Sequence, residues 1–200
     1  SKHPTRQWLS KEEAKALIDN GLIELKKFST SDNPDIVFAS CGDTPNIETL
    51  AAVSILKKFI PNIKLRVLNV LEVLKLESDK RNPFGLTDTK FNAYFTKDKP
   101  VIFDFHGYPA FIHSLIYDRE NKNFLVHGYL EEGSITTAFD MRLRNKIDRF
   151  SLLEDALNYL PDTKEKETLK EYIEEELKKH YSYVKEYGLD LEEITNFALE

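Results

Sequence analysis

Three short apolar runs, at residues 36–41, 65–70 and 101–107, constrain the fold of this chain more than any other feature. Their length is typical of strands that are buried on both faces, and it is too short for typical helices. Each run is followed by residues with helical spacing or by a short helical turn. Strands that alternate with helices predict an α/β fold, with a mostly parallel sheet covered by helices on both faces.

Helix boundaries are also marked in the sequence. Ser10 and Glu13 form the capping-box pattern of a helix start, and Gly21 stands where the C-cap of that helix belongs. Thr44 followed by Pro45 predicts an N-cap and a first-turn proline for the helix after the first apolar run. These local patterns predict where helices start and stop without reference to any tertiary contact.

The last third of the chain has a helical period throughout. Apolar residues recur at helical spacing from 139 to 160, with a predicted break near Asp148, and a long charged helix is predicted over 164–187. Gly188 ends it. We therefore expect residues 1–200 to form a single domain whose part from 139 to 200 is mainly helical.

The charge of the chain argues against two classes of partner. The net charge is −6, and residues 161–200, with 6 Lys/Arg and 12 Asp/Glu, supply all of it. An acidic tail repels phosphate backbones and anionic lipids. No apolar run approaches the roughly 20 residues that span a bilayer. We expect neither nucleic acid nor a membrane as a partner.

The cysteine content and the N-terminal sequence indicate the cellular compartment of the chain. Cys41 is the only cysteine, so no internal disulfide can form, which fits a reducing compartment such as the cytoplasm. The sequence begins with Ser1 rather than Met, and it lacks the apolar core of a signal peptide. We interpret the chain as cytoplasmic and as part of a longer polypeptide.

The first candidate site comprises Gly42, Asp43 and Thr44, between the first apolar run and the helix that follows it. Ligands of open α/β sheets bind at such strand ends, because helix N-termini offer free amides and a positive dipole. Asp43 opposes a phosphate there, since like charges about 4 Å apart repel by about 4 kcal/mol at an effective dielectric constant of 20. A tight turn with helix caps and a contact with a partner domain are the alternatives.

The second candidate site comprises Asp104, His106 and Tyr108. Asp104 and His106 are two residues apart on a predicted strand, so they share a face. A carboxylate that orients an imidazole is half of a general-base arrangement. The alternatives are a hydrogen-bonded structural histidine and a histidine at a domain interface. A third metal ligand is not found at any usual spacing, so no metal site is predicted.

Two further hypotheses rest on fewer residues. Cys41 could act as a nucleophile with His106 or His127, although a lone cysteine at the end of an apolar strand more often packs in the core. Lys2 and Arg6 could clamp an anion such as a sugar phosphate, or they could belong to a frayed terminus.

Five longer sequence motifs indicate one protein family. They are Ser-Lys-His-Pro at 1–4, Cys-Gly-Asp-Thr-Pro at 41–45 with Glu-Thr-Leu-Ala-Ala at 48–52, Lys-Pro-Val-Ile-Phe at 99–103 with Phe-His-Gly-Tyr-Pro at 105–109, Gly-Tyr at 128–129 with Glu-Glu-Gly at 131–133, and Thr-Thr at 136–137 with Phe-Asp-Met-Arg at 139–142. In this order, the chain resembles the C-terminal domain of the phosphoketolases that act on xylulose 5-phosphate and fructose 6-phosphate.

The resemblance implies a three-layer α/β/α fold like the last domain of transketolases. It implies a mixed, mostly parallel five-stranded sheet with a C-terminal helical extension. The strands are expected near residues 22–28, 35–41, 64–70, 100–106 and 124–129. Residues 1–9 are expected to link this domain to a preceding one.

The resemblance also implies an activity for a longer enzyme. A phosphoketolase is an aldehyde-lyase that uses thiamine diphosphate and a divalent ion such as Mg²⁺. It cleaves a ketose phosphate with inorganic phosphate to give acetyl phosphate and an aldose phosphate. In the family, two earlier domains build the cofactor pocket at a dimer interface. The implied partners are therefore the preceding domains and further copies, in a homodimer or a higher homo-oligomer.

For this chain alone, the resemblance implies no catalytic residue, no bound cofactor or metal ion, and no activity. Its implied role is assembly and the rim of the active site, with Gly42, Asp43, Thr44, His106 and Tyr108 as the candidate rim or interface residues.

Lys2 is the one substrate-binding residue that the resemblance implies. It matches a lysine that lies near the substrate phosphate in the family.

Two other functions stay open beside this one. The first is a stand-alone regulatory domain that binds a small anion or metabolite at Gly42 and His106. The second is an interaction module for dimer contact, which an exposed apolar patch would favour.

Overall fold

The computed structural model describes residues 7–130 and 135–197. In chain order the elements are α1 (Lys11–Asn20), β1 (Leu22–Glu24), β2 (Ile36–Cys41), α2 (Asp43–Phe59), β3 (Leu65–Val70), the 3₁₀ helix η1 (Val73–Leu76), α3 (Asp88–Phe95), β4 (Val101–Phe105), α4 (Pro109–Ile116), β5 (Phe124–Gly128), α5 (Ala138–Asn145), α6 (Arg149–Leu157), α7 (Lys164–Tyr187) and α8 (Glu192–Thr195). From β2 to β5 every strand is separated from the next by at least one helix, as the apolar runs predict.

The strands form one mixed sheet in the order β1-β3-β2-β4-β5. β1 is antiparallel to β3, and the other neighbouring strands are parallel. This confirms the mostly parallel five-stranded sheet. The first strand is shorter than the expected range of 22–28, because the chain turns after Glu24 and the Phe28 amide donates to the Leu25 carbonyl at 3.0 Å.

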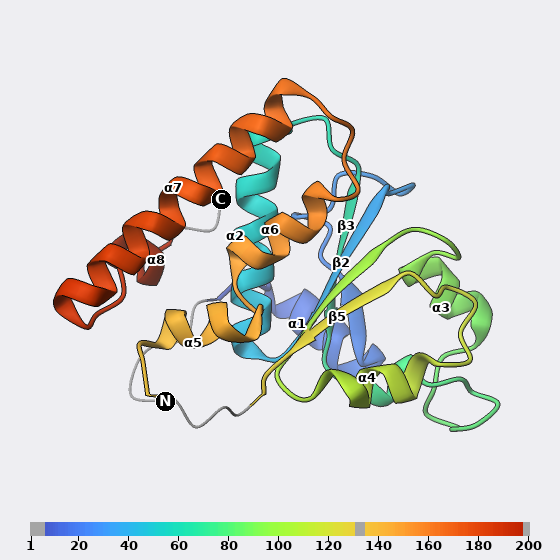
Figure 1. The fold of residues 1–200 in the computed structure, drawn as a ribbon. Coiled ribbons are helices and arrows are strands. Elements are labelled where there is room, and N and C mark those ends of the chain that lie inside the picture. The colour runs from blue at the N-terminus through green and yellow to red at the C-terminus, as the bar shows by residue number, and fades with distance from the viewer. Residues whose placement is uncertain (1–6, 131–134, 198–200) are drawn as a thin grey trace.

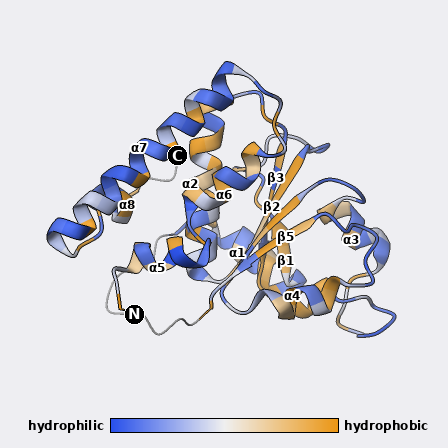
Figure 2. Cartoon of the chain, viewed as in Figure 1, coloured by the Kyte–Doolittle hydropathy of each residue, from blue (hydrophilic) through white to orange (hydrophobic). Residues whose placement is uncertain are grey.

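Helices cover both faces of the sheet, which gives the three-layer α/β/α architecture (Figure 1). On one face, Phe38 and Ile102 pack with Leu153 of α6 in a core that also includes residues of α2 and α7. On the other face, Phe103 packs with residues of α3 and α4, including Phe91. Figure 2 shows the strands as mainly hydrophobic, whereas α7 is largely hydrophilic on its outer side.

The C-terminal part is helical, as its period predicts. The break near Asp148 is confirmed, because the Asp148 carboxylate caps α6 and accepts from the Phe150 amide at 2.8 Å. The long charged helix runs from Lys164 to Tyr187, and Gly188 ends it in the left-handed conformation with φ 67°. Within the described ranges, the structure has no helix that is both long and apolar enough to cross a membrane.

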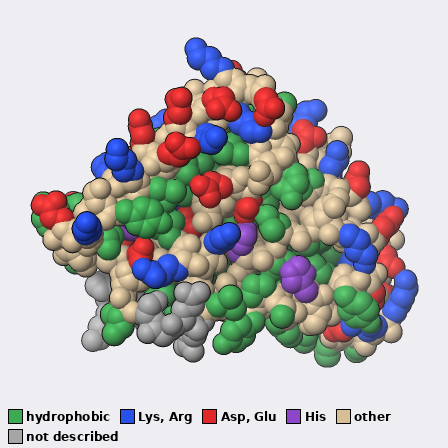
Figure 3. Space-filling model, viewed as in Figure 1, with side chains coloured by type: hydrophobic (Ala, Val, Ile, Leu, Met, Phe, Trp, Pro, Cys, Tyr) green, Lys and Arg blue, Asp and Glu red, His purple; other side chains and the backbone are tan. Residues whose placement is uncertain are grey.

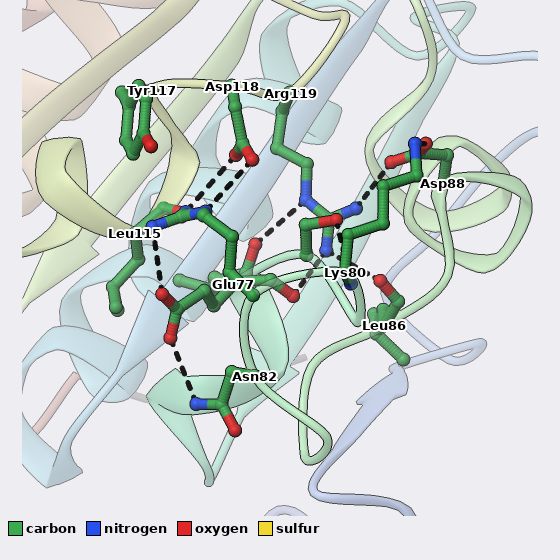
Figure 4. Close-up of polar contacts among 12 residues, drawn as sticks. Glu77, Lys80, Asn82, Leu86, Asp88, Leu115, Tyr117, Asp118 and Arg119 are labelled. Atoms are coloured by element: carbon green, nitrogen blue, oxygen red, sulfur yellow. Dashed lines mark hydrogen bonds and ion pairs between the residues drawn. The ribbon is translucent and has the colours of Figure 1, made fainter.

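A buried arginine holds the long connection between η1 and α3 (Figure 4). The Arg119 guanidinium donates to the carbonyls of Leu76, Glu77 and Leu86 and to the Asp88 carboxylate, at 2.5 to 2.9 Å. Arg119 is only 1% exposed. Leu76 is the last residue of η1, and Glu77 and Leu86 lie at the two ends of the connection. The planar guanidinium therefore holds both ends of this irregular segment.

Candidate functional site

The parallel strands bring the candidate residues to one edge of the sheet. β2, β3, β4 and β5 are in parallel register, so their carboxyl ends share an edge, at the bottom of Figure 1 where α2 and α4 begin. Three candidates, Gly42, Asp43 and Thr44, follow β2. The other two, His106 and Tyr108, follow β4 and are exposed. We call this side of the molecule the carboxyl edge.

Gly42 makes the turn from β2 into α2, and only glycine fits there. Its backbone has φ 116° and ψ 157°, a region that L-residues rarely adopt. A Cβ at this position would lie 2.5 Å from the Cβ of His106. The His106 amide donates to the Cys41 carbonyl at 3.0 Å, which ties the ends of β2 and β4 together.

A polar network stabilises the start of α2. The Asn46 side-chain amide donates to the Gly42 carbonyl at 2.8 Å, and the Ser40 hydroxyl donates to Asn46 Oδ1 at 2.8 Å. The prediction that Thr44 is the N-cap is wrong: α2 starts at Asp43, and Gly42 occupies the cap position without a side-chain bond. The sharp turn at Gly42 starts the helix earlier than the Thr-Pro pattern indicates.

The predicted pairing of Asp104 with His106 is also wrong. His106 lies one residue beyond β4 and is exposed, and its ring stacks on Tyr129 with centroids 6.3 Å apart. Asp104 is fully buried, and neither of its carboxylate oxygens has a hydrogen-bond partner among the described residues. The strand ends before His106, so the two side chains do not share a strand face.

Cys41 is a packing residue. Its side chain contacts the core cluster between the sheet and α3 and α4. Burial raises the pKa of the Cys41 thiol to about 11, so the thiol stays protonated near neutral pH. This environment supports the core interpretation and not the nucleophile.

A buried charged network lies between the sheet and the C-terminal helices. Both oxygens of Glu48, on α2, accept from the guanidinium of Arg149, at 2.8 and 3.0 Å. Arg142, on α5, donates to Glu48 Oε1 at 2.6 Å. Glu48 is 0% exposed and Arg149 is 2% exposed. The network therefore fixes α5 and α6 to the first turns of α2, beside the carboxyl edge.

Two further buried acids lie in the same layer. Burial, and then the nearby charges of Glu48 and Asp148, raise the pKa of Asp104 well above its usual value. Burial raises the pKa of Asp148 to about 6, although the Ser151 hydroxyl and amide donate to it. The protonated, neutral form of Asp104 is therefore favoured in the folded chain.

A carboxylate-bound histidine does occur, but not the predicted one. His127 Nε2 of β5 contacts Asp155 Oδ2 of α6, and both side chains are largely buried. From the sequence, His127 is a candidate only as a partner of Cys41. No sequence pattern indicates Asp155 as its partner, because 28 residues separate Asp155 from His127. Only the packing of α6 on β5 brings the two side chains together.

The carboxyl edge does not fit a metal-bound diphosphate. Among the described residues, no group of three or more His, Cys, Asp or Glu side chains is placed to hold a metal ion. The first turn of α2 presents the exposed Asp43 carboxylate, which repels phosphate. A cavity of about 510 Å³ does occur, but it lies between α2 and α7, beside Lys57, Phe59 and Tyr172. We therefore assign no catalytic step to these residues.

Comparison with known proteins decides the family. The family model described as "XFP C-terminal domain" matches residues 2–199. The chain belongs to this family, the C-terminal domain of phosphoketolases. The sequence motifs that predicted membership of this family are therefore confirmed as family motifs.

Curated relatives agree with this assignment. The chain is 48% identical over 201 residues to a probable phosphoketolase of Pediococcus pentosaceus, covering 99% of this chain and 26% of the relative. It is 44% identical over 200 residues to a xylulose-5-phosphate phosphoketolase of Lactiplantibacillus pentosus, covering 98% of this chain and 25% of the relative. The chain thus spans about a quarter of the length of these relatives.

A solved structure supports the transketolase-like fold. A transketolase from Leishmania mexicana superposes with a TM-score of 0.50 at 12% identity, over 74% of this chain and 19% of that one. The similarity concerns the fold alone.

Two of the sequence motifs that identify this phosphoketolase domain contact each other in the structure. Glu48 belongs to the motif at 48–52 and Arg142 to the motif at 139–142, and the two side chains form an ion pair. Lys2, the predicted substrate-binding residue, lies outside the described residues. Gly42, Asp43, Thr44, His106 and Tyr108 share the carboxyl edge, and their role as a rim stays a prediction.

Gly42 and Gly188 provide a matched test of the strand-end turn. Both have positive φ, but a Cβ at Gly188 has nothing within 4 Å. Gly188→Ala should therefore cost about 1–2 kcal/mol of unfolding free energy. Gly42→Ala should cost about 3 kcal/mol or more, because the clash with His106 adds to the backbone strain. Urea unfolding of both variants measures the difference, and equal costs would contradict the close approach of β2 and β4.

The raised pKa of Asp104 predicts that the unfolding free energy depends on pH. An acid with a higher pKa in the folded state binds more protons folded than unfolded, so the unfolding free energy falls as pH rises above the unfolded pKa of about 4. Asp104→Asn keeps the shape without the ionisation, so it should raise the urea midpoint more near pH 8 than near pH 5. Asp98→Asn, an exposed change before β4, is the control and should shift stability by less than about 0.5 kcal/mol. A gain that is equal at both pH values would refute the prediction.

Proposed function

We propose that this chain is the C-terminal domain of a cytoplasmic phosphoketolase. The full enzyme cleaves xylulose 5-phosphate, and also fructose 6-phosphate, with inorganic phosphate to give acetyl phosphate and an aldose phosphate. The observation that carries this proposal is the alignment of 98% of the chain, at 44% identity, with a protein named xylulose-5-phosphate phosphoketolase. A family model for a phosphoketolase domain over residues 2–199 supports it.

The proposal divides the work between this domain and the rest of the enzyme. Thiamine diphosphate with Mg²⁺, held by the earlier domains, supplies the carbon–carbon bond cleavage when bound. This domain supplies Lys2 for the substrate phosphate, and Gly42, Asp43, Thr44, His106 and Tyr108 at the rim. It also contributes to assembly of the homodimer or higher oligomer. The misfit of the carboxyl edge to a metal-bound diphosphate supports this division.

An acetyl phosphate assay tests both parts of the proposal. The full-length enzyme that contains this chain should form acetyl phosphate from xylulose 5-phosphate, phosphate, thiamine diphosphate and Mg²⁺. The isolated 200-residue chain should form none. In the full-length enzyme, Lys2→Met should raise KM for the ketose phosphate by about 10- to 100-fold, the loss of one charge-assisted hydrogen bond.

Lys11→Met is the matched control, because Lys11 is an exposed lysine in the first turn of α1 and should leave KM unchanged. Turnover by the isolated chain would contradict the accessory role. Absence of acetyl phosphate from the full-length enzyme would contradict the activity itself.

A further inference from the structure

The cavity between α2 and α7 lies apart from the carboxyl edge. Its volume of about 510 Å³ is within the range of roughly 300–1,000 Å³ that small-molecule pockets have. It is lined by Ser54, Ile55, Lys57, Lys58, Phe59, Tyr172 and Phe197. α2 starts at the carboxyl edge, and at about 1.5 Å per residue Lys57 lies about 20 Å along the helix from Asp43. We call this space the α2–α7 cavity.

Aromatic rings form much of the apolar wall of this cavity. The Phe59 and Tyr172 rings have centroids 5.0 Å apart and are tilted by 39°, which joins the end of α2 to α7. A second cavity, of about 280 Å³, shares Ile55, Tyr172 and Phe197 with the first, so the apolar wall continues toward α8. Aromatic rings pack well against such walls in offset or edge-to-face arrangements. The wall therefore suits a ligand with a flat aromatic body.

The charged groups that line the α2–α7 cavity are all cationic. Lys57 and Lys58 line it, and no carboxylate of the described residues does. Neither lysine forms an ion pair or a hydrogen bond within the described ranges. By contrast, a cavity of about 400 Å³ between α6 and α7 is lined by four carboxylates and two lysines. Figure 3 shows the same mixture of acidic and basic side chains along the upper margin, over α7. The α2–α7 cavity is therefore complementary to a negatively charged group.

Tyr172 supplies a neutral hydrogen-bond donor to the same cavity. Burial raises the pKa of the Tyr172 hydroxyl, so this group stays protonated near neutral pH. It makes no hydrogen bond with another described residue. A protonated phenol donates to a carboxylate, so the hydroxyl adds to the attraction of the two lysines for an anion.

The position of the lysines limits the charge of the ligand. Lys57 and Lys58 lie in the last turn of α2, where the helix dipole has its negative end. Polyphosphates are bound best at helix N-termini and by arginine forks. Arg149 lines the adjacent cavity, but its guanidinium is already bound to both oxygens of Glu48. The geometry therefore favours a ligand with a single carboxylate over a polyphosphate.

We propose that the α2–α7 cavity is a ligand site separate from the carboxyl edge, and that its ligand is a flat aromatic monocarboxylate. The aromatic body packs against Phe59, Tyr172 and Phe197. The carboxylate pairs with Lys57 and Lys58 and accepts from the Tyr172 hydroxyl. This site uses none of the residues named under the proposed function, so it stands apart from that proposal.

Calorimetric titration of the full-length enzyme with 2-naphthoate tests this site. The wild-type enzyme should bind one 2-naphthoate per chain in a saturable way. The double variant Lys57→Gln with Lys58→Gln should raise Kd by about tenfold or more, because it removes the charged partners of the carboxylate. The double variant Lys11→Gln with Lys15→Gln is the matched control, since both lysines are exposed on α1, and it should leave Kd unchanged.

Two further measurements separate the charge from the ring. 2-Naphthalenemethanol has the same ring without the carboxylate, and it should bind about tenfold more weakly or worse. Tyr172→Phe keeps the aromatic wall and removes only the hydroxyl, so it should raise Kd for 2-naphthoate by about 2- to 10-fold.

Three outcomes overturn the proposal. The first is no saturable binding of 2-naphthoate by the wild-type enzyme, and the second is an unchanged Kd in the Lys57→Gln, Lys58→Gln variant. The third is displacement of 2-naphthoate by an equal concentration of ATP, which would assign the cavity to a nucleotide. If circular dichroism shows that the lysine variant is misfolded, Tyr172→Phe decides in its place. The acetyl phosphate assay contains no 2-naphthoate, so its result is independent of this one.

Discussion

The contact between Glu48 and Arg149 is the interaction on which the rest of the arrangement depends. It joins α2, which follows the Gly42 turn, to α6, which carries the carboxylate partner of His127. A buried guanidinium without its carboxylate is strongly destabilising, because its charge is neither solvated nor paired. The pair therefore fixes the C-terminal helices against the strands, and through them the segments that form the carboxyl edge.

Local chemistry made much of the fold predictable. The Ser10 cap, the break at Asp148 and the stop at Gly188 each depend on a few neighbouring residues, and the structure has all three. The candidate site was less predictable. Asp104 and His106 are close in sequence but separated by the end of a strand, whereas His127 and Asp155 meet only because a distant helix packs on β5. Periodicity gives the face of an element, and not what packs on that face.

The carboxyl edge combines three features that the proposed accessory role would explain together. It has a tight glycine turn, a set of strand-end polar residues, and exposed large apolar side chains such as Leu71 and Tyr108. The proposed activity would require a cradle for a metal-bound diphosphate, and the described residues of the carboxyl edge do not fit one. A surface that completes a site built elsewhere requires shape and complementarity, which held strand ends provide.

A double-mutant cycle on Glu48 and Arg149 tests the central claim most directly. Urea unfolding of Glu48→Gln, Arg149→Met and the double variant gives the three free energies. Glu48→Gln should cost about 3–5 kcal/mol, because it leaves the Arg149 guanidinium buried without a carboxylate. Arg149→Met should cost less than that, because Arg142 still donates to Glu48. The double variant should cost less than the sum of the singles by about 2 kcal/mol or more. Costs that add within about 0.5 kcal/mol would show that the pair does not hold the C-terminal helices in place.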